Sequence, residues 1–194
     1  IMDIRTIYLC ISLLAGIVCL YSTFSKSKEK MLLLQCLDVI LHGISNLLQG
    51  GYTAVLANLF ALTRNILFSL KINEHKSNKS LEFLVFYRKY ITMIFLIIAS
   101  ILALITNKLG ALGLIPVLAT AEYSIGTIIT TNANQQKMLL FINCLMWFIY
   151  DLIIKMWPAA IMDIIIGIIS FIHFIGIYDQ LVITLKNRRI YEKI

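Results

Sequence analysis

Seven apolar runs, each close to the length of a membrane-spanning helix, dominate this sequence of 194 residues. A helix needs about 20 apolar residues to cross the roughly 30 Å hydrocarbon layer of a bilayer. The runs lie near residues 4–24, 31–48, 52–70, 89–106, 109–131, 138–155 and 158–184. The chain is 60% hydrophobic and 14% charged, with a mean hydropathy of +0.88, whereas a soluble domain is about 25% charged. We therefore expect an all-α, polytopic membrane protein, with the lipid bilayer as its main partner.

The basic residues divide unequally between the two sets of connections. Three of them, Arg5, Lys108 and Lys155, lie on one side of the expected helices, and thirteen lie on the other. Cytosolic loops carry the excess of Lys and Arg in membrane proteins, so the pattern predicts an external amino terminus and a cytosolic carboxyl terminus. The asymmetry accounts for the net charge of +7. The sequence contains no basic–aromatic cluster of the kind that would indicate a nucleic-acid partner. The thirteen are Lys26, Lys28, Lys30, Lys71, Lys76, Lys79, Arg88, Lys89, Lys137, Lys186, Arg188, Arg189 and Lys193.

Two parts of the chain resemble each other. The stretches KMLLLQCLDVILHG (30–43) and KMLLFINCLMWFIYD (137–151) both follow a polar break and lead through a tight turn into another helix. Asn58 then corresponds to Asp163 once a Gly-Gly insertion is allowed. Parallel three-helix repeats need one extra crossing between them, a known transporter plan. The sequence thus predicts a 3+1+3 order. The first repeat covers residues 1–71 and the second covers 108–185. Residues 72–107 between them hold a cytosolic loop, an interfacial segment (80–90) and the linker helix. A basic cytosolic tail (186–194) follows.

Three stretches carry a resemblance to a known family: YTAVLANLFALTRNILF, LGLIPVLATAEYSIGTI and INCLMWFIYDLIIKMWPAAIMDIIIGII. Over about residues 8–180 the chain resembles the YgjV family of bacterial inner-membrane proteins. The most specific elements are the spacing of Asn58 and Arg64 and the Leu-Ile-Pro-Val around Pro116. That family is similar in architecture to the SWEET and PnuC transporters of sugars and vitamins. The resemblance implies location in the bacterial inner membrane and a SWEET-like arrangement.

Polar side chains recur on one face of the expected helix 31–48. Gln35, Asp38, His42, Asn46 and Gln49 follow a 3-4-4-3 spacing, which places them along a single face. Such a stripe is costly against lipid and is expected to face protein or water. The predicted substrate-binding residues lie on this and other helices: His42, Asn46, Asn58, Asn143, Trp147, Tyr150 and Asp163.

Arg64 interrupts an otherwise apolar helix. Counting about 1.5 Å per residue along each helix places Asp38, Arg64 and Glu122 at similar depths in the cytosolic half. The tight turn after the second helix favours an Asp38–Arg64 ion pair. This charged layer acts either as a structural lock, or as an inner gate or a substrate anion site. Arg64 reaching the headgroups is a third interpretation.

These features favour a transporter that moves a small polar solute, of sugar, vitamin or nucleoside type, by alternating access. The acidic excess within the helices leaves proton coupling or a cationic substrate open. The alternative is a ligand-binding or receptor-like module of the same fold. An intramembrane aspartyl enzyme built on Asp151 and Asp163 is disfavoured because the Gly-x-Gly-Asp half of its signature is absent, so we predict no enzyme. The four cysteines lie in apolar spans without a CxxC pair, and we predict no metal or cofactor. Whether the protein is a monomer or a homo-oligomer stays open.

Overall fold

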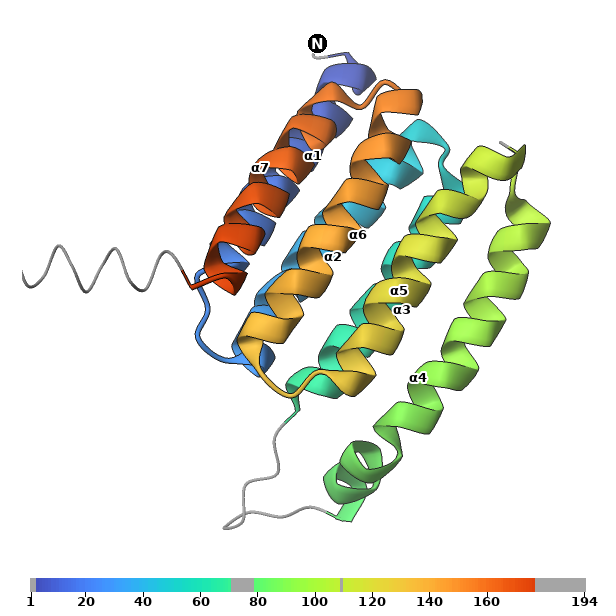
Figure 1. Ribbon diagram of the computed structural model, residues 1–194. Helices are drawn as coiled ribbons and strands as arrows, with labels where there is room; N and C mark the ends of the chain where they lie inside the picture. The colour runs from blue at the N-terminus through green and yellow to red at the C-terminus, as the bar shows by residue number, and fades with distance from the viewer. Residues whose placement is uncertain (1–2, 71–78, 109, 177–194) are drawn as a thin grey trace, which may run out of the picture.

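The computed structural model describes residues 3–70, 79–108 and 110–176, and these form seven α-helices and one short 3-10 helix (Figure 1). The helices are α1 (Ile4–Ser22), α2 (Lys28–Gln49), α3 (Tyr52–Ser69), α4 (Lys79–Thr106), η1 (Gly110–Leu114), α5 (Ile115–Ile129), α6 (Ala133–Ile153) and α7 (Trp157–Phe174). No strand occurs among the described residues. The prediction of an all-α chain is confirmed.

Local sequence signals explain where several helices begin. The Ser27 side chain accepts a hydrogen bond from the Lys30 amide at the start of α2 (3.3 Å), and Asn132 accepts one from the Gln135 amide at the start of α6 (2.9 Å). Both are favourable N-caps because they satisfy an amide that has no partner within the helix. Proline occupies the first turn of α5 and of α7, where its missing N–H costs nothing.

The helices form two facing rows of three. In one row α2 packs between α1 and α3, and in the other α6 packs between α5 and α7. Figure 1 shows α1 behind α7, α2 behind α6 and α3 behind α5, and the facing pairs are in contact. α4 lies outside both rows, against α3 and α5. We call α1–α3 the first triplet and α5–α7 the second triplet.

Successive helices run in opposite directions, so each end of the assembly collects one set of connections (Figure 1). One end holds the starts of α2, α4 and α6, and it carries the basic residues Lys26, Lys28, Lys30, Lys79 and Lys137; we call it the basic end. The other end holds the α2–α3 and α6–α7 turns, and we call it the turn end. The residues between the two ends are mostly apolar, and many large side chains point outward. Such a surface suits a lipid environment.

Six of the described helical segments are long and apolar enough to cross a membrane: α1, α2, the Glu82–Thr106 part of α4, Gly110–Ile129, α6 and α7. α3 is not among them. Its 18 residues include Asn58, Arg64 and Asn65, which lower its hydropathy. α3 packs against α2, α4 and α5 and buries these side chains, so it contributes polar groups to the interior. The assembly thus has the character of a polytopic membrane protein.

Two expected boundaries differ from the structure. The segment 80–90, expected as an interfacial helix that leads into the fourth span at residue 89, forms the first turns of α4, which begins at Lys79. The last helix, expected to reach residue 184, ends at Phe174, and Gly176 adopts a left-handed conformation with φ of 71°; the expected part at 177–184 lies outside the described residues. Glycine tolerates this conformation without steric cost. The expected basic tail (186–194) and the loop at 72–78 lie outside the described residues.

The two helix turns at the turn end match each other at a separation of 105 residues. Gly50 and Lys155 both have positive φ (80° and 62°). The next residue in each turn, Gly51 or Met156, donates its amide to Asn46 or Asp151 respectively, at 2.8 Å in both cases. The caps Ser27 and Asn132 are also 105 apart. The alignment that pairs the two Lys-Met-Leu-Leu stretches is therefore shifted by two residues, and no Gly-Gly insertion is needed.

Candidate functional site

A cavity lies between the two triplets, within the apolar bundle. About 70 Å³ of it is open to the centres of water molecules, and one water requires roughly 10–15 Å³ by the same measure. The space therefore accommodates several waters or a small polar group in this conformation. α2 and α6 each contribute a line of residues at helical spacing.

Most of the residues predicted from the sequence meet in this cavity. Eight of them line it: Asp38, His42, Asn46, Asn58, Arg64, Asn143, Trp147 and Asp163. Tyr150 does not line it. Its side chain is buried behind Trp147, whose ring it meets edge-on with centroids 5.7 Å apart. Glu122 also lies outside the lining, half-buried on α5, close enough to Arg64 to interact electrostatically.

The cavity also contains polar residues that were absent from the predicted site. They are Ser12, Cys19, Gln35, Asn65, Thr120, Tyr123, Cys144 and Asp151. Gln35 was visible as part of the polar stripe on α2, and Asp151 as a carboxyl group within an apolar run. Ser12, Cys19 and Thr120 gave no comparable signal, because small residues of this kind are common in membrane helices. Their role emerges only when the facing helices are brought together.

Arg64 is held by neutral partners. Its Nε and Nη2 donate to Asn65 Oδ1 at 3.0 and 2.9 Å, and its Nη1 donates to Ser124 Oγ at 3.0 Å. The guanidinium also lies over the ring of Tyr123, 4.6 Å from the centroid, a favourable cation–π arrangement. Arg64 is 3% exposed. These contacts connect α3 to α5 and therefore link the two triplets.

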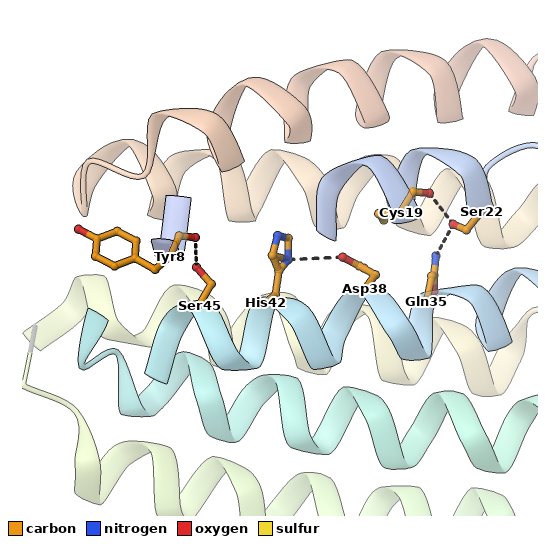
Figure 2. Close-up of polar contacts among 7 residues, drawn as sticks. All are labelled: Tyr8, Cys19, Ser22, Gln35, Asp38, His42 and Ser45. Carbon is orange, nitrogen blue, oxygen red and sulfur yellow. Dashed lines mark hydrogen bonds and ion pairs between the residues drawn. The ribbon is translucent and has the colours of Figure 1, made fainter. Parts of the chain in front are cut away.

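The expected Asp38–Arg64 ion pair is not among the contacts of the described residues. Asp38 Oδ1 instead lies 3.5 Å from His42 Nδ1, one helical turn further along α2 (Figure 2). The prediction was wrong about the partner because a tight turn fixes which helices are neighbours but leaves the rotation of each helix undetermined. α3 turns Arg64 toward α5, and Asp38 points between α1 and α2, where the Cys19 side chain lies against its carboxyl group.

The polar stripe on α2 makes contacts on several sides. Gln35 Nε2 donates to Ser22 Oγ at 3.5 Å, and Ser45, next to the stripe, donates to the carbonyl of Tyr8 at 2.8 Å. Both bonds connect α2 to α1 (Figure 2). Gln35 also accepts a 3.0 Å hydrogen bond from the hydroxyl of Tyr123 on α5. The stripe therefore faces protein and the cavity rather than lipid, as its spacing predicted.

Asp151 and Asp163 form a carboxyl pair at the turn end of the cavity. Asp151 lies in the last turn of α6 and Asp163 lies in the second turn of α7. Their side chains are within hydrogen-bonding reach of each other. Both line the cavity, and they are only 6% and 8% exposed. Two carboxyl groups form a hydrogen bond to each other only when they share a proton. The pair is therefore a place where a proton or another cation can be held.

The contacts that close the cavity are unequal at its two ends. Toward the basic end, Lys28 Nζ on α2 donates to the carbonyls of Thr127 and Thr130 at the end of α5, both at 2.6 Å. The Gln35–Tyr123 and Arg64–Ser124 bonds lie on the same side of the cavity. Toward the turn end, Gln49 Nε2 donates to the carbonyl of Ile154 at 3.3 Å. Among the described residues, the hydrogen bonds between the triplets are therefore more numerous at the basic end than at the turn end.

The comparison with protein families bears on the whole described bundle. Residues 6–180 match the Imp-YgjV family, described as bacterial inner membrane protein. The chain belongs to this family. The resemblance to YgjV proteins inferred from the sequence is confirmed, and family membership agrees with the several apolar helices of the fold. No curated protein matches the chain, and no solved structure matches it. The function of this Imp-YgjV family member must therefore be argued from its own residues.

Proposed function

We propose that this protein is a transporter that moves a small polar solute across the bacterial inner membrane by alternating access. The observation that carries the proposal is the polar cavity between the two triplets, to which all six of their helices contribute. Binding sites of small molecules are concave and combine apolar walls with a few polar groups that fix orientation. Here Asn58, Asn143, Trp147 and Asp163 supply such groups among alanine, leucine and isoleucine side chains.

The proposed arrangement is 3+1+3, with the triplets as parallel repeats and α4 as the linker. Its support is the pairing of helices across the rows, since α1 contacts α7 and α3 contacts α5. A two-fold axis along the membrane normal that relates the triplets, with α2 and α6 nearest the axis, produces this pairing. The matched turns, caps and amide bonds at a separation of 105 residues agree with it. This plan is the basis for comparing the protein with SWEET-like transporters.

The proposed orientation places the basic end in the cytosol and the amino terminus outside. It rests on the excess of Lys and Arg at the basic end over Arg5, Lys108 and Lys155 at the other end. Single cysteines introduced at Lys26 and Lys155 into a cysteine-free variant test it. In whole cells a membrane-impermeant maleimide is expected to label Lys155→Cys and to leave Lys26→Cys unlabelled until the membrane is disrupted. The reverse pattern contradicts the orientation.

Alternating access requires the triplets to separate at one end while they stay closed at the other. The basic-end bonds of Lys28, Gln35 and Arg64 form the proposed inner gate, and the Gln49–Ile154 bond is the corresponding contact of the outer closure among the described residues. In this conformation the inner gate is closed. The cavity at about 70 Å³ is narrow for a sugar-sized solute, so binding such a solute requires the turn end to open.

Uptake into proteoliposomes tests the function. We expect a panel of radiolabelled sugars, nucleosides, vitamins and amines to include at least one solute that accumulates faster than in protein-free vesicles. Asn58→Ala is expected to reduce that uptake at least tenfold, because Asn58 faces the cavity. Leu59→Ala is the matched control, since Leu59 is 59% exposed on the outer face of the same helix turn. Equal uptake by both variants contradicts the cavity assignment.

The Asp151–Asp163 pair also favours a second candidate function, intramembrane hydrolysis. Aspartic proteases use two carboxyl groups that share one proton to activate water. The chain lacks the Gly-x-Gly-Asp half of the membrane-protease signature, with Ala-Ile-Met before Asp163, so transport remains our proposal and we propose no enzymatic activity. Cleavage of a fluorogenic membrane-helix peptide that is lost in Asp163→Asn reverses this choice.

A further inference from the structure

The carboxyl pair of Asp151 and Asp163 lies where the cavity reaches the turn end. The cavity-lining carboxyl groups are Asp38, Asp151 and Asp163, and its only permanently charged cation among the described residues is Arg64. Arg64 is satisfied by Asn65, Ser124 and the ring of Tyr123. Arg64 therefore already has its partners at the basic-end side of the cavity. Among the described residues that line the cavity, no permanently charged cation lies beside the carboxyl pair at the turn end.

Titratable groups surround the pair from the neighbouring helices. α2 presents Asp38 and His42, which contact each other. The other titratable groups within its electrostatic reach are Cys19 of α1 and Cys144 and Tyr150 of α6. None of these groups is a fixed cation. A second negative charge on the pair is therefore opposed by the first carboxylate, by burial and by the nearby Asp38 unless a cation neutralises it.

Open hydrogen-bonding atoms point to a ligand beside the pair. Asp163 Oδ2 and Asn58 Nδ2 are buried and have no hydrogen-bond partner among the described residues, and both side chains line the cavity. Asn58 is 6% exposed. Buried polar atoms normally have partners. Trp147 lines the same cavity, and an indole face attracts a cation within about 6 Å of the ring centroid.

The corresponding positions of the first triplet carry amides. At the 105-residue separation, Asn46 corresponds to Asp151 and Asn58 corresponds to Asp163, and all four residues line the cavity. Asn and Asp have nearly the same shape, so the scaffold itself does not require acids at these positions. The carboxyl groups therefore contribute charge to one side of an otherwise similarly shaped cavity.

We infer that the Asp151–Asp163 pair recognises the cationic group of a transported solute, which takes the place of the proton that the two carboxyl groups share. This inference rests on the proposed transport function. In the exchange, the pair starts as one carboxylic acid hydrogen-bonded to one carboxylate. A primary, quaternary or guanidinium cation binds to two carboxylates and one proton leaves to solvent. Charge is conserved, because one positive charge enters the site and one leaves it.

The exchange couples cation binding to pH. While the pair holds its proton in the free protein, each bound cation releases one proton, so the apparent Kd falls by about tenfold for each unit of pH increase. The solute class that fits is a small organic cation with a flat or methylated head group, since asparagine amides and an indole line the rest of the site. In transport, this chemistry corresponds to exchange of one cation for one proton.

Thermal unfolding of the purified full-length protein in detergent tests the inference. The cationic probes are methylammonium and choline chlorides, with sodium chloride at equal ionic strength and glucose as references. We expect a cationic probe to raise the Tm, by more at higher pH, with the apparent Kd changing about tenfold per pH unit. Asp151→Asn and Asp163→Asn are expected to weaken binding at least tenfold and to remove the pH dependence.

Matched variants separate this role from a structural one. The amides of the first triplet indicate that Asp→Asn fits the scaffold, and Glu82→Gln removes a carboxyl group on α4, outside the cavity lining; we expect it to bind the probes as the wild type does. A cationic shift that is independent of pH, or that survives in the Asp151→Asn/Asp163→Asn double variant, overturns the inference. The absence of any Tm increase of the wild type with the cationic probes also overturns it. That measurement does not depend on whether any variant folds.

The proposed transport function and the proposed cation recognition can be refuted independently of each other. If choline binds as described but is not taken up by proteoliposomes in exchange for protons, recognition of a cation stands and transport does not. If a neutral solute such as glucose is taken up and the double variant transports it as well as the wild type, transport stands and the cationic class is wrong.

Discussion

Replacing Arg64 by methionine isolates the contribution of the buried guanidinium to stability. The change removes three hydrogen bonds, two to Asn65 Oδ1 and one to Ser124 Oγ, and the cation–π contact with Tyr123. Hydrogen bonds between membrane helices contribute about 0.6 kcal/mol on average and up to about 1.7, and a desolvated cation–π contact contributes about 2 kcal/mol. Part of this total is offset because the variant no longer buries a charge. We expect a net destabilisation of roughly 2 kcal/mol.

A double-mutant cycle makes the prediction specific to the geometry. Arg64→Met, Ser124→Ala and their combination are compared by unfolding in mixed detergent, followed by the fluorescence of Trp147 and Trp157. Because Arg64 Nη1 donates to Ser124 Oγ at 3.0 Å, we expect a coupling free energy of about 1 kcal/mol. The parallel cycle with Asp38→Asn is expected to give a coupling near zero, since Asp38 contacts His42 instead.

The two cycles distinguish the structure from the interpretation based on sequence alone. A membrane ion pair between Arg64 and Asp38 requires strong coupling between those two residues and little between Arg64 and Ser124. That result refutes the described arrangement of α3 against α5. Arg64→Lys adds a further check. Lysine retains the charge but lacks the planar fork that reaches both partners, so we expect it to recover less than half of the lost stability.

Substitutions at Gly16, Met162 and Lys28 probe the contacts between the triplets. Gly16→Ala is expected to lower the Tm, because the added Cβ lies 2.7 Å from Cβ and Cγ of Met162. Met162→Gly is expected to restore much of the loss and Met162→Ala little of it, since alanine keeps the clashing Cβ. Lys28→Met is expected to destabilise the protein by about 2 kcal/mol in detergent unfolding, because two carbonyls at the end of α5 lose a charged donor. If Lys28 belongs to the inner gate, a maleimide is also expected to label Cys19 faster in this variant when applied from the cytosolic side.

The sequence predicted the helices and the cavity-facing residues far better than it predicted pairing. Apolar run lengths and the spacing of Gln35, Asp38, His42 and Asn46 on α2 were enough to find seven helices and the face that turns inward. These are local properties, fixed by the period of the helix. The position of Arg64 along its expected membrane helix also suggested that its side chain was buried, and that residue is 3% exposed.

Partners across the bundle depend on helix rotation, which a single sequence does not determine. Arg64 was expected to meet Asp38 because both lie at a similar depth, yet Ser124, an unremarkable hydroxyl in an apolar run, is its partner on the facing helix. Tyr150 was expected to face the cavity with Trp147, but it is buried behind that ring. The Asp151–Asp163 pair was seen in the sequence only as two acids near a turn. Their closeness arises from the antiparallel packing of α6 on α7.

The 105-residue correspondence between the triplets has a consequence for how such a cavity can acquire polarity. A symmetric dimer of a single triplet presents identical side chains from both subunits on either side of its axis, so any acid introduced on one side appears on the other as well. A chain that carries both triplets is free of that constraint. Here it sets the amides Asn46 and Asn58 against the acids Asp151 and Asp163. Joining the halves in one polypeptide thus allows a ligand to be bound in a single orientation, which a strictly symmetric site cannot specify.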